Sequence, residues 1–306
     1  MIIVLAGATA VGKSELALAL ARRLGATILV ADSMQVYKDM DIGTAKPTRE
    51  EQAEILHGGL NLATPEQRFS VADYLKAAAE HFRHFSHRAL IICGGSGLYL
   101  RALREGIAEV PPIPCEILNK LQTLSLQELQ ALIQTTDSKV AKKIDIKNPR
   151  RLIRALAVKM ATGRSILEWQ MQQHSSLLSD KKAHYFWIRR NEKEEIERIQ
   201  NRIEEMFKKG WLEEVRQLLK KYAPEKILNH AAIGYGQIAN FLQDESSQKP
   251  DLQKLKENIF TETRQYRKRQ YTWFKKELCW QILNVSGLTT DTLADKILQM
   301  TTRSAD

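Results

Sequence analysis

The sequence predicts an α/β fold, in which a parallel β-sheet is flanked by helices and the chain carries an all-α insertion. Three observations support this prediction. A glycine-rich turn at residues 7–14 joins an apolar segment to a helical one. Short aliphatic segments then alternate with helix-like segments, which is the order of elements in a parallel sheet. Residues 116–179 favour helices and contain no convincing strand-like segment.

The first part of the chain supplies most of the expected sheet. The segment of residues 2–6 is short and wholly apolar, which predicts a buried strand. The Leu/Ala spacing of residues 15–24 predicts the helix after the turn. A second strand is expected at residues 27–31 and a third at residues 89–93, with a helix at residues 71–85 between them. Because loops after parallel strands gather at one edge of the sheet, we expect ligands to bind at that edge.

A change of composition marks the insertion. Three prolines between residues 111 and 114 interrupt the alternating pattern, and the helical stretch follows them. Residues 185–188 predict a final strand of the sheet, and helices predicted at residues 193–222 and 252–278 complete the core. We therefore expect two domains, with these bounds: a core of residues 1–113 and 183–306, and a helical insertion of residues 114–182.

Composition favours a polyanionic partner. The 306 residues include 46 Lys and Arg against 36 Asp and Glu, which gives a net charge of +10 and favours nucleic acid among possible partners. Cys93, Cys115 and Cys279 are too widely spaced for a disulfide framework or a Cys-x-x-Cys metal site, so we expect a cytoplasmic protein. No apolar run approaches the roughly 20 residues that span a bilayer, so no membrane partner is expected.

The glycine-rich turn matches the phosphate-binding P-loop pattern G-x-x-x-x-G-K-[ST] in full. Its glycines allow a backbone path whose N–H groups converge on phosphate oxygens, helped by the positive end of the following helix. The lysine adds a point charge, and the serine adds a hydroxyl that can bind Mg²⁺. The pattern therefore predicts a P-loop NTPase-like sheet with a phosphate site formed by Gly7, Ala8, Thr9, Ala10, Val11, Gly12, Lys13 and Ser14.

The strand ends argue against ordinary nucleotide hydrolysis. A P-loop hydrolase usually ends a later strand with an Asp that holds Mg²⁺, whereas the third expected strand runs into Gly94 and Gly95. Asp32 instead follows the second strand and would face the same edge as the P-loop. Its carboxylate could bind Mg²⁺ or accept a proton from a second substrate, and the alternative is a turn or a helix cap.

Eight further motifs follow the P-loop in order. They lie at residues 32–37, 41–47, 69–73, 94–99, 151–156, 210–215, 232–235 and 263–274. Together with the P-loop they resemble the tRNA dimethylallyltransferase (tRNA isopentenyltransferase) family along nearly the whole chain. A P-loop alone is unspecific, whereas nine motifs in one order form a specific match.

The resemblance implies a prenyl transfer reaction. The family transfers a dimethylallyl group from dimethylallyl diphosphate to N6 of the tRNA adenosine immediately 3′ of the anticodon, giving N6-dimethylallyladenosine. The P-loop here would hold the diphosphate, although such loops are commonly labelled ATP-binding, and Ser14 and the diphosphate would share Mg²⁺. Lys13 would stabilise the leaving diphosphate, and Arg202 matches a position that reaches it. Asp32 resembles the general base, and Ser96, where Thr is usual, would hydrogen-bond near the reacting groups.

The resemblance also implies a tRNA surface. In the family the stretch that matches residues 32–35 and the motif that begins at residue 151 contact tRNA, and the expected partner is the anticodon stem-loop. Basic side chains crowd the same part of the insertion, between residues 139 and 154, and a helical face near Tyr271 carries Arg264, Arg267, Lys268 and Lys275. We therefore expect tRNA contacts from Asp32, Ser33, Met34, Gln35, Arg150, Arg151, Leu152, Ile153, Arg154 and Arg264, in a protein that acts as a monomer.

Three other functions remain open at this point. An isopentenyltransferase that acts on free adenine nucleotides would share the P-loop and the Asp32 motif but would not need the basic insertion. A P-loop nucleotide kinase would lack the usual Asp at its later strand end. A non-catalytic RNA-binding protein would leave the intact P-loop unexplained.

Overall fold

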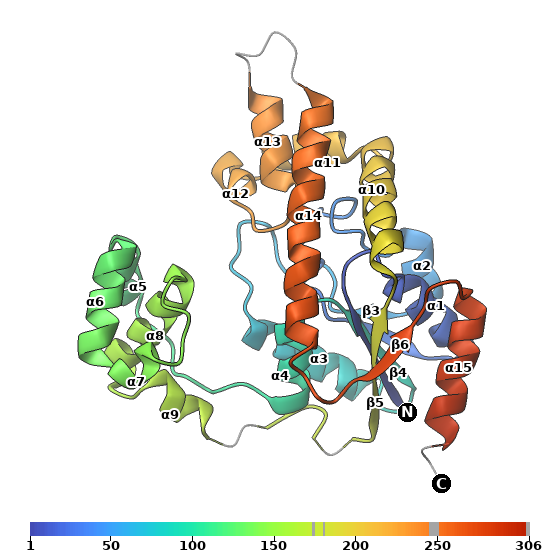
Figure 1. The fold of residues 1–306 in the computed structure, drawn as a ribbon, viewed down its shortest axis with the longest axis horizontal. Coiled ribbons are helices and arrows are strands. Elements are labelled where there is room, and N and C mark those ends of the chain that lie inside the picture. The colour runs from blue at the N-terminus through green and yellow to red at the C-terminus, as the bar shows by residue number, and fades with distance from the viewer. Residues whose placement is uncertain (173–174, 180, 245–250, 304–306) are drawn as a thin grey trace. The chain divides into compact units, whose positions relative to one another are not determined.

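The computed structural model describes residues 1–172, 175–179, 181–244 and 251–303, and the chain divides into two compact units (Figure 1). The core unit comprises Met1–Arg104 and Asp180–Asp306, and the helical unit comprises Glu105–Ser179. Within the described residues, no helix has both the length and the apolar character needed to cross a membrane.

The core unit is built on a six-stranded sheet with the strand order β3-β2-β4-β1-β5-β6. Each pair of neighbouring strands is parallel, so the prediction of a parallel α/β sheet is confirmed. The strands are β1 (Ile2–Gly7), β2 (Thr27–Val30), β3 (His57–Gly58), β4 (Leu90–Gly94), β5 (Ala183–Arg189) and β6 (Gln281–Asn284).

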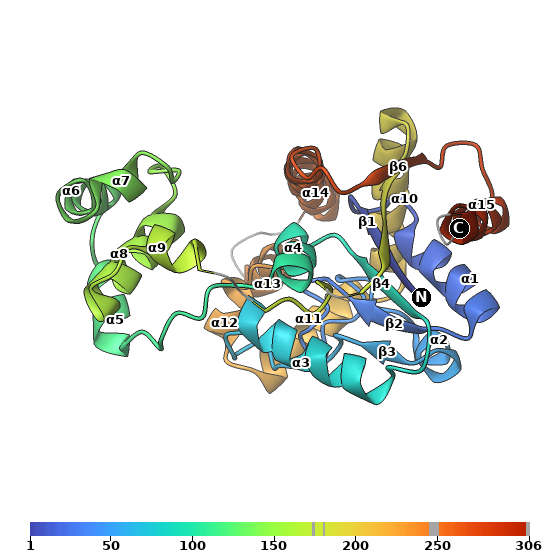
Figure 2. The same cartoon turned by 90° about the horizontal axis from the view of Figure 1, so that it is seen from below.

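Helices cover both faces of this sheet (Figure 2). Alternate strand residues such as Ile3 and Leu5 pack with the buried residues of α1 (Lys13–Leu24) and α15 (Thr290–Arg303). On the opposite face Trp187 of β5 packs against Phe274, with ring centroids 6.2 Å apart. That face is covered by α3 (Val71–His84), α4 (Gly97–Glu105) and α14 (Leu252–Phe274). Because both faces are covered, the central strands β1, β2 and β4 are nearly continuous apolar runs.

A second apolar cluster in the core unit joins several helices to the chain around Met40. Its centre is Trp211, which is 2% exposed. A Cβ atom added to Gly43 would lie 2.2 Å from Trp211 Nε1, so only glycine fits against this ring. The helices of this region are α10 (Glu192–Lys208), α11 (Trp211–Lys221), α12 (Pro224–Leu228), α13 (Tyr235–Gln243) and the first half of α14. The short helix α2 (Arg49–Glu54) has no residue in this cluster.

The helical unit has an apolar core of its own. Its helices are α5 (Cys115–Gln122), α6 (Leu126–Thr136), α7 (Ser138–Ala141), α8 (Pro149–Thr162) and α9 (Ile166–Gln170). Ser125 and Ser165 start α6 and α9 with reciprocal capping boxes. Leu152 is 0% exposed in this core. Leu152 is one of the residues predicted to bind tRNA, and its side chain packs between helices, so this contact, which stays a prediction, would be made by its backbone.

Candidate active site

The P-loop connects the end of β1 to the start of α1 at the carboxyl edge of the sheet. Two of its residues have left-handed backbones, Ala10 with φ 62° and Gly12 with φ 100°. At Gly7 a Cβ atom would lie 2.8 Å from the carbonyl oxygen of Ile188, so the turn passes too close to β5 for a side chain. The loop therefore has the tight path that a phosphate cradle requires.

Cationic side chains bind the loop carbonyls. Lys13 Nζ donates to Ala8 O at 2.6 Å, and Arg198 Nε of α10 donates to Ala10 O at 2.9 Å. A trans peptide unit points its N–H opposite to its C=O. The N–H that follows each bound carbonyl therefore points away from the cation. The first of these two N–H groups, that of Thr9, is donated to Gln270 Oε1 at 2.9 Å. The second, that of Val11, is left for an anion, while the carbonyl oxygens are neutralised.

Asp32 lies on the turn that follows β2. Its Oδ1 accepts a hydrogen bond from Met34 N at 2.9 Å. The second carboxylate oxygen accepts no hydrogen bond from the residues that the structure describes. The Asp32 charge raises the pKa of Lys13 and of Arg202, although burial, which is the larger effect, lowers both of these pKa values. These electrostatic effects show that the carboxylate lies near both cations.

Arg202 brings a second cation to the site from α10. In the described part of the chain the guanidinium has no ion pair and no hydrogen bond. Burial lowers its pKa, the nearby Arg198 lowers it further, and Asp32 opposes both effects. A poorly solvated arginine without a partner has its donors free, and it is suited to bind an anion in two places at once.

Ser96 is joined to the Asp32 turn by hydrogen bonds. Its Oγ accepts from Ser33 N at 2.9 Å and donates to Ser33 Oγ at 3.2 Å. Burial raises the pKa of Tyr266 of α14, and the neighbouring Ser96 lowers it. Next to it, a Cβ atom on Gly94 would lie only 2.0 Å from Ala31 O. This close approach of β2 and β4 explains why the strand ends in glycine and not in the Asp typical of hydrolases.

One cavity of about 1030 Å³ unites most of these groups. The structure thus brings together Lys13, Ser14, Asp32 and Arg202, as the sequence predicted for a phosphate site beside a carboxylate. Gln35 also lines the cavity, but its Nε2 is bound to Thr44 O at 3.1 Å. Further lining residues are Thr9, Ala10, Gly12, Cys93, Gly94, Gly95, Arg198, Tyr266 and Gln270.

The remaining predicted residues divide by exposure. Ser33 and Met34 are partly buried in the core unit, and Ile153 is partly buried in the helical unit. Ala8 and Val11 are 1% and 0% exposed, so they can offer only their backbone to a ligand. The exposed residues among those predicted to bind tRNA are Arg150, Arg151 and Arg154 of α8 and Arg264 of α14.

Arg267 does not belong to the predicted basic face. It is 7% exposed and pairs with Glu192 at 2.9 Å and with Glu195, which is 0% exposed. Tyr271 also donates to Glu195. The prediction that Arg267 lies on the RNA-facing surface is wrong, because its charge is neutralised inside the protein, where it joins α14 to α10.

Sequence reasoning missed the side chains that support the site from outside the P-loop. These are Arg198, Tyr266 and Gln270. The spacing of Tyr266 and Gln270, four residues apart on one helix, places them on the same face and could have indicated a shared target. Nothing in the sequence indicated which loops that face would contact.

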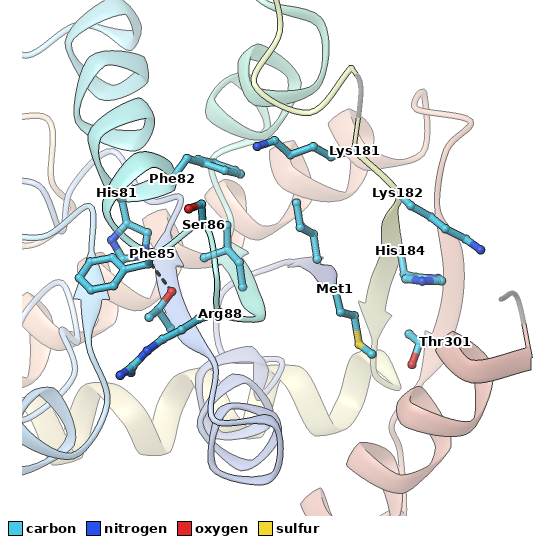
Figure 3. Close-up of a pocket in the computed structure, with 13 residues that line it drawn as sticks. Met1, His81, Phe82, Phe85, Ser86, Arg88, Lys181, Lys182, His184 and Thr301 are labelled. Atoms are coloured by element: carbon cyan, nitrogen blue, oxygen red, sulfur yellow. Dashed lines mark hydrogen bonds between the residues drawn. The ribbon is translucent and has the colours of Figure 1, made fainter.

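A second cavity, of about 490 Å³, lies at the opposite edge of the sheet, where the strands begin (Figure 3). Figure 3 shows Lys181 directed towards the ring of Phe82, and the ammonium lies 4.9 Å from the ring centroid. His81 and Thr27 share a hydrogen bond of 3.0 Å at this edge. Because the P-loop and Asp32 are at the other ends of the strands, this cavity is not part of the candidate active site.

The fold and the site together define a P-loop transferase, in which a carboxylate faces a phosphate cradle without the Asp of the nucleotide hydrolases. A family model described as IPP transferase matches residues 35–277. The chain belongs to the IPP transferase family, as an enzyme of the tRNA dimethylallyltransferase type.

Relatives and solved structures agree with this assignment. The chain is 35% identical to a tRNA dimethylallyltransferase of Methylacidiphilum infernorum, over 91% of this chain and 84% of that protein. It is 38% identical to that of Trichormus variabilis, over 90% of each. A full-length tRNA isopentenylpyrophosphate transferase of Bacillus halodurans matches 98% of this chain and 95% of its own, with a TM-score of 0.69 and 27% identity.

A eukaryotic dimethylallyltransferase acting on tRNA matches this fold with a higher TM-score, 0.82, at 26% identity. The match covers 97% of this chain and 77% of that protein.

Proposed function

We propose that this enzyme transfers the dimethylallyl group of dimethylallyl diphosphate to N6 of the adenosine immediately 3′ of the anticodon in tRNA. One observation carries the proposal, namely that Asp32 and the P-loop line the same cavity, together with Lys13 and Arg202. The reaction forms an N6–carbon bond and breaks the allylic carbon–oxygen bond. The proton of N6 goes to Asp32, and diphosphate leaves.

The cradle suits the leaving group. Negative charge grows on the diphosphate as the carbon–oxygen bond breaks, and the loop N–H groups, Lys13 and Arg202 stabilise that charge. Ser14 is exposed in the first turn of α1 and lines the cavity, so its hydroxyl fits an Mg²⁺ ion shared with the diphosphate. When bound, Mg²⁺ neutralises part of the diphosphate charge.

Asp32 suits the role of general base. The lone pair of N6 is delocalised into the adenine ring, so the amine needs a proton acceptor as it attacks carbon. The hydrogen bond from Met34 N orients one carboxylate oxygen, and the other remains available to the substrate. Ser96, tied to Ser33, supports the same turn, and we infer that it adjusts the position of the adenine or the diphosphate.

Exposed cations supply a surface for the tRNA backbone. In the helical unit, Arg150, Arg151 and Arg154 are exposed on α8, and in the core unit Arg264 and Lys268 are exposed on α14. Phosphate contacts of this kind position the RNA without reading its sequence. The target adenine must leave its stack to reach the Asp32 carboxylate in the cavity. We infer that the helical unit, expected from the sequence at residues 114–182 and found at Glu105–Ser179, is the tRNA-contacting domain and that the enzyme acts as a cytoplasmic monomer.

The test compares two acceptors. The purified chain is incubated with dimethylallyl diphosphate, Mg²⁺ and either an anticodon stem-loop or AMP, and the products are digested and analysed by mass spectrometry. We expect N6-dimethylallyladenosine in the stem-loop only. Prenylation of AMP at an equal or greater rate would instead identify an enzyme of free adenine nucleotides.

A further inference from the structure

We propose that Gln270 is a positioning residue that fixes the phosphate cradle relative to the Ser96 turn. This inference rests on the proposed function, because the two loops would hold the two substrates. Gln270 is 6% exposed and belongs to α14, more than 250 positions from the P-loop in sequence. Its side chain is the direct polar link between the two loops.

The two ends of the Gln270 amide bind two different loops. Its Oε1 accepts from Thr9 N at 2.9 Å, and its Nε2 donates to Gly95 O at 3.0 Å. The opposite amide orientation would place oxygen against the Gly95 oxygen and nitrogen against the Thr9 nitrogen, so only one orientation satisfies both loops. A Cβ atom on Gly95 would lie 2.4 Å from Nε2, which shows how closely the amide fits.

The Thr9 contact has a consequence for phosphate binding. A backbone N–H has one proton, and that of Thr9 is already donated to Gln270. Thr9 therefore fixes the path of the loop, and the cradle is formed by the N–H groups that follow it. The diphosphate position thus depends on where α14 places this side chain.

Helix α14 is itself firmly placed. One turn before Gln270, Tyr266 lines the same cavity as Gln270. On the neighbouring face, Arg267 and Tyr271 bind the buried Glu195 of α10. Since α10 also carries Arg202, one helix sets the relative positions of the P-loop, the Ser96 turn and the second cation of the site.

Such a link acts on the alignment of two substrates more than on the binding of either one. A displacement of about 1 Å between reacting groups can lower the rate by about 100-fold. We therefore assign Gln270 an effect on kcat, with little effect on KM for the stem-loop.

The test replaces Gln270 by Met, which keeps the length of the side chain but forms neither hydrogen bond. The control is Gln265→Met, the same substitution at an exposed position of the same helix. We expect Gln270→Met to lower kcat by about 100-fold, with KM for the stem-loop and the Kd of inorganic diphosphate both within about threefold of the parent. Gln265→Met should match the parent. Retention of kcat within threefold, or a loss confined to KM, would overturn the proposal.

A second measurement does not depend on the reaction. Hydrogen exchange is measured on the full chain without substrate. The Thr9 amide should exchange faster in Gln270→Met than in the parent, whereas the amides of strand β4 should exchange at the same rate in both. Equal protection of Thr9 would refute the link even if the parent enzyme prenylates tRNA. Faster exchange in a parent that fails to prenylate would preserve the link and reject the proposed function. If Gln270→Met does not fold, Gln270→Glu is used, because it keeps an acceptor for Thr9 and loses the donor to Gly95.

Discussion

Asp32 Oδ1 accepts a hydrogen bond from the backbone of Met34 at 2.9 Å, and this bond orients a carboxylate that lines the cavity. Asp32→Asn preserves the acceptor for Met34 N but removes the base. We expect kcat to fall by about 10²- to 10⁴-fold, while the Kd for the anticodon stem-loop stays within about threefold. Single-turnover rates and filter binding measure the two quantities.

The control for Asp32 removes the same charge elsewhere in the same cavity wall. Asp39 also lines the cavity and pairs with Lys221 at 2.8 Å on the exposed side. Asp39→Asn should keep kcat within about threefold of the parent. If both variants lost activity equally, the effect would be one of net charge, and the assignment of Asp32 as base would fail.

Arg202 gives a prediction about the diphosphate. Its guanidinium forms no ion pair with the described residues, so Arg202→Met removes a partner of the ligand and leaves no protein carboxylate unpaired. Charged hydrogen bonds contribute about 1.5–3 kcal/mol, and we expect the Kd of inorganic diphosphate to rise by about 10- to 100-fold, as measured by calorimetry. Arg216→Met, at an exposed arginine paired with Glu213, is the control and should bind diphosphate like the parent. An unchanged Kd in Arg202→Met would show that this cation does not reach the ligand.

Much of the fold could be predicted because its signals are local. Strands β1, β2 and β4 are buried along their whole length, β5 has a buried apolar centre, and the P-loop is a contiguous motif. The edge strand β6 was missed, since three of its four residues are exposed. The helix expected at residues 193–222 is instead two helices, because Gly210 has φ 95° and begins a new one. The last helix, α15, was not predicted at all.

The site also divides into residues that local sequence signals predict and residues whose roles depend on distant contacts. Lys13, Ser14 and Asp32 belong to motifs that follow strands, so the strand order alone places them at one edge. The role of Gln270 depends on contacts with residues 261 and 175 positions away in sequence. Contacts of that kind arise from tertiary packing, and no periodicity or spacing encodes them.

Neighbouring residues of α8 should respond in opposite ways. Leu152 is 0% exposed, and Leu152→Ala should lower the free energy of unfolding of the helical unit by about 2–5 kcal/mol. Arg151 is exposed, so Arg151→Ala should leave the free energy of unfolding unchanged. The same variant should bind the stem-loop more weakly, and the salt dependence of its binding should fall by about one phosphate contact. Urea unfolding and binding at several salt concentrations measure these effects. An Arg151 variant with unaltered salt dependence would exclude this arginine from the RNA surface.

His230 gives a prediction about acid stability. Burial lowers its pKa to about 4, and the neutral ring accepts a hydrogen bond from Ala232 N through Nδ1 at 3.2 Å. The edge of its ring also meets Tyr37, with centroids 4.6 Å apart. Because the pKa in the folded state is below the ordinary value near 6.5, the unfolded chain gains a proton first as the pH falls. The folded state therefore loses stability between about pH 6.5 and 4, and the loss is complete below that range.

His230→Asn tests this effect, because the Asn side-chain oxygen can accept the Ala232 hydrogen bond without titrating. The fall of the His230 pKa from about 6.5 to about 4 corresponds to about 3 kcal/mol of pH-dependent stability. We expect urea unfolding to show a smaller loss of stability from pH 7 to pH 4.5 in the variant than in the parent, whatever their difference at pH 7. Both chains carry the same carboxylates, so the difference between the two pH profiles isolates the imidazole. Parallel profiles would mean that His230 titrates with an ordinary pKa and that its pocket is open to water.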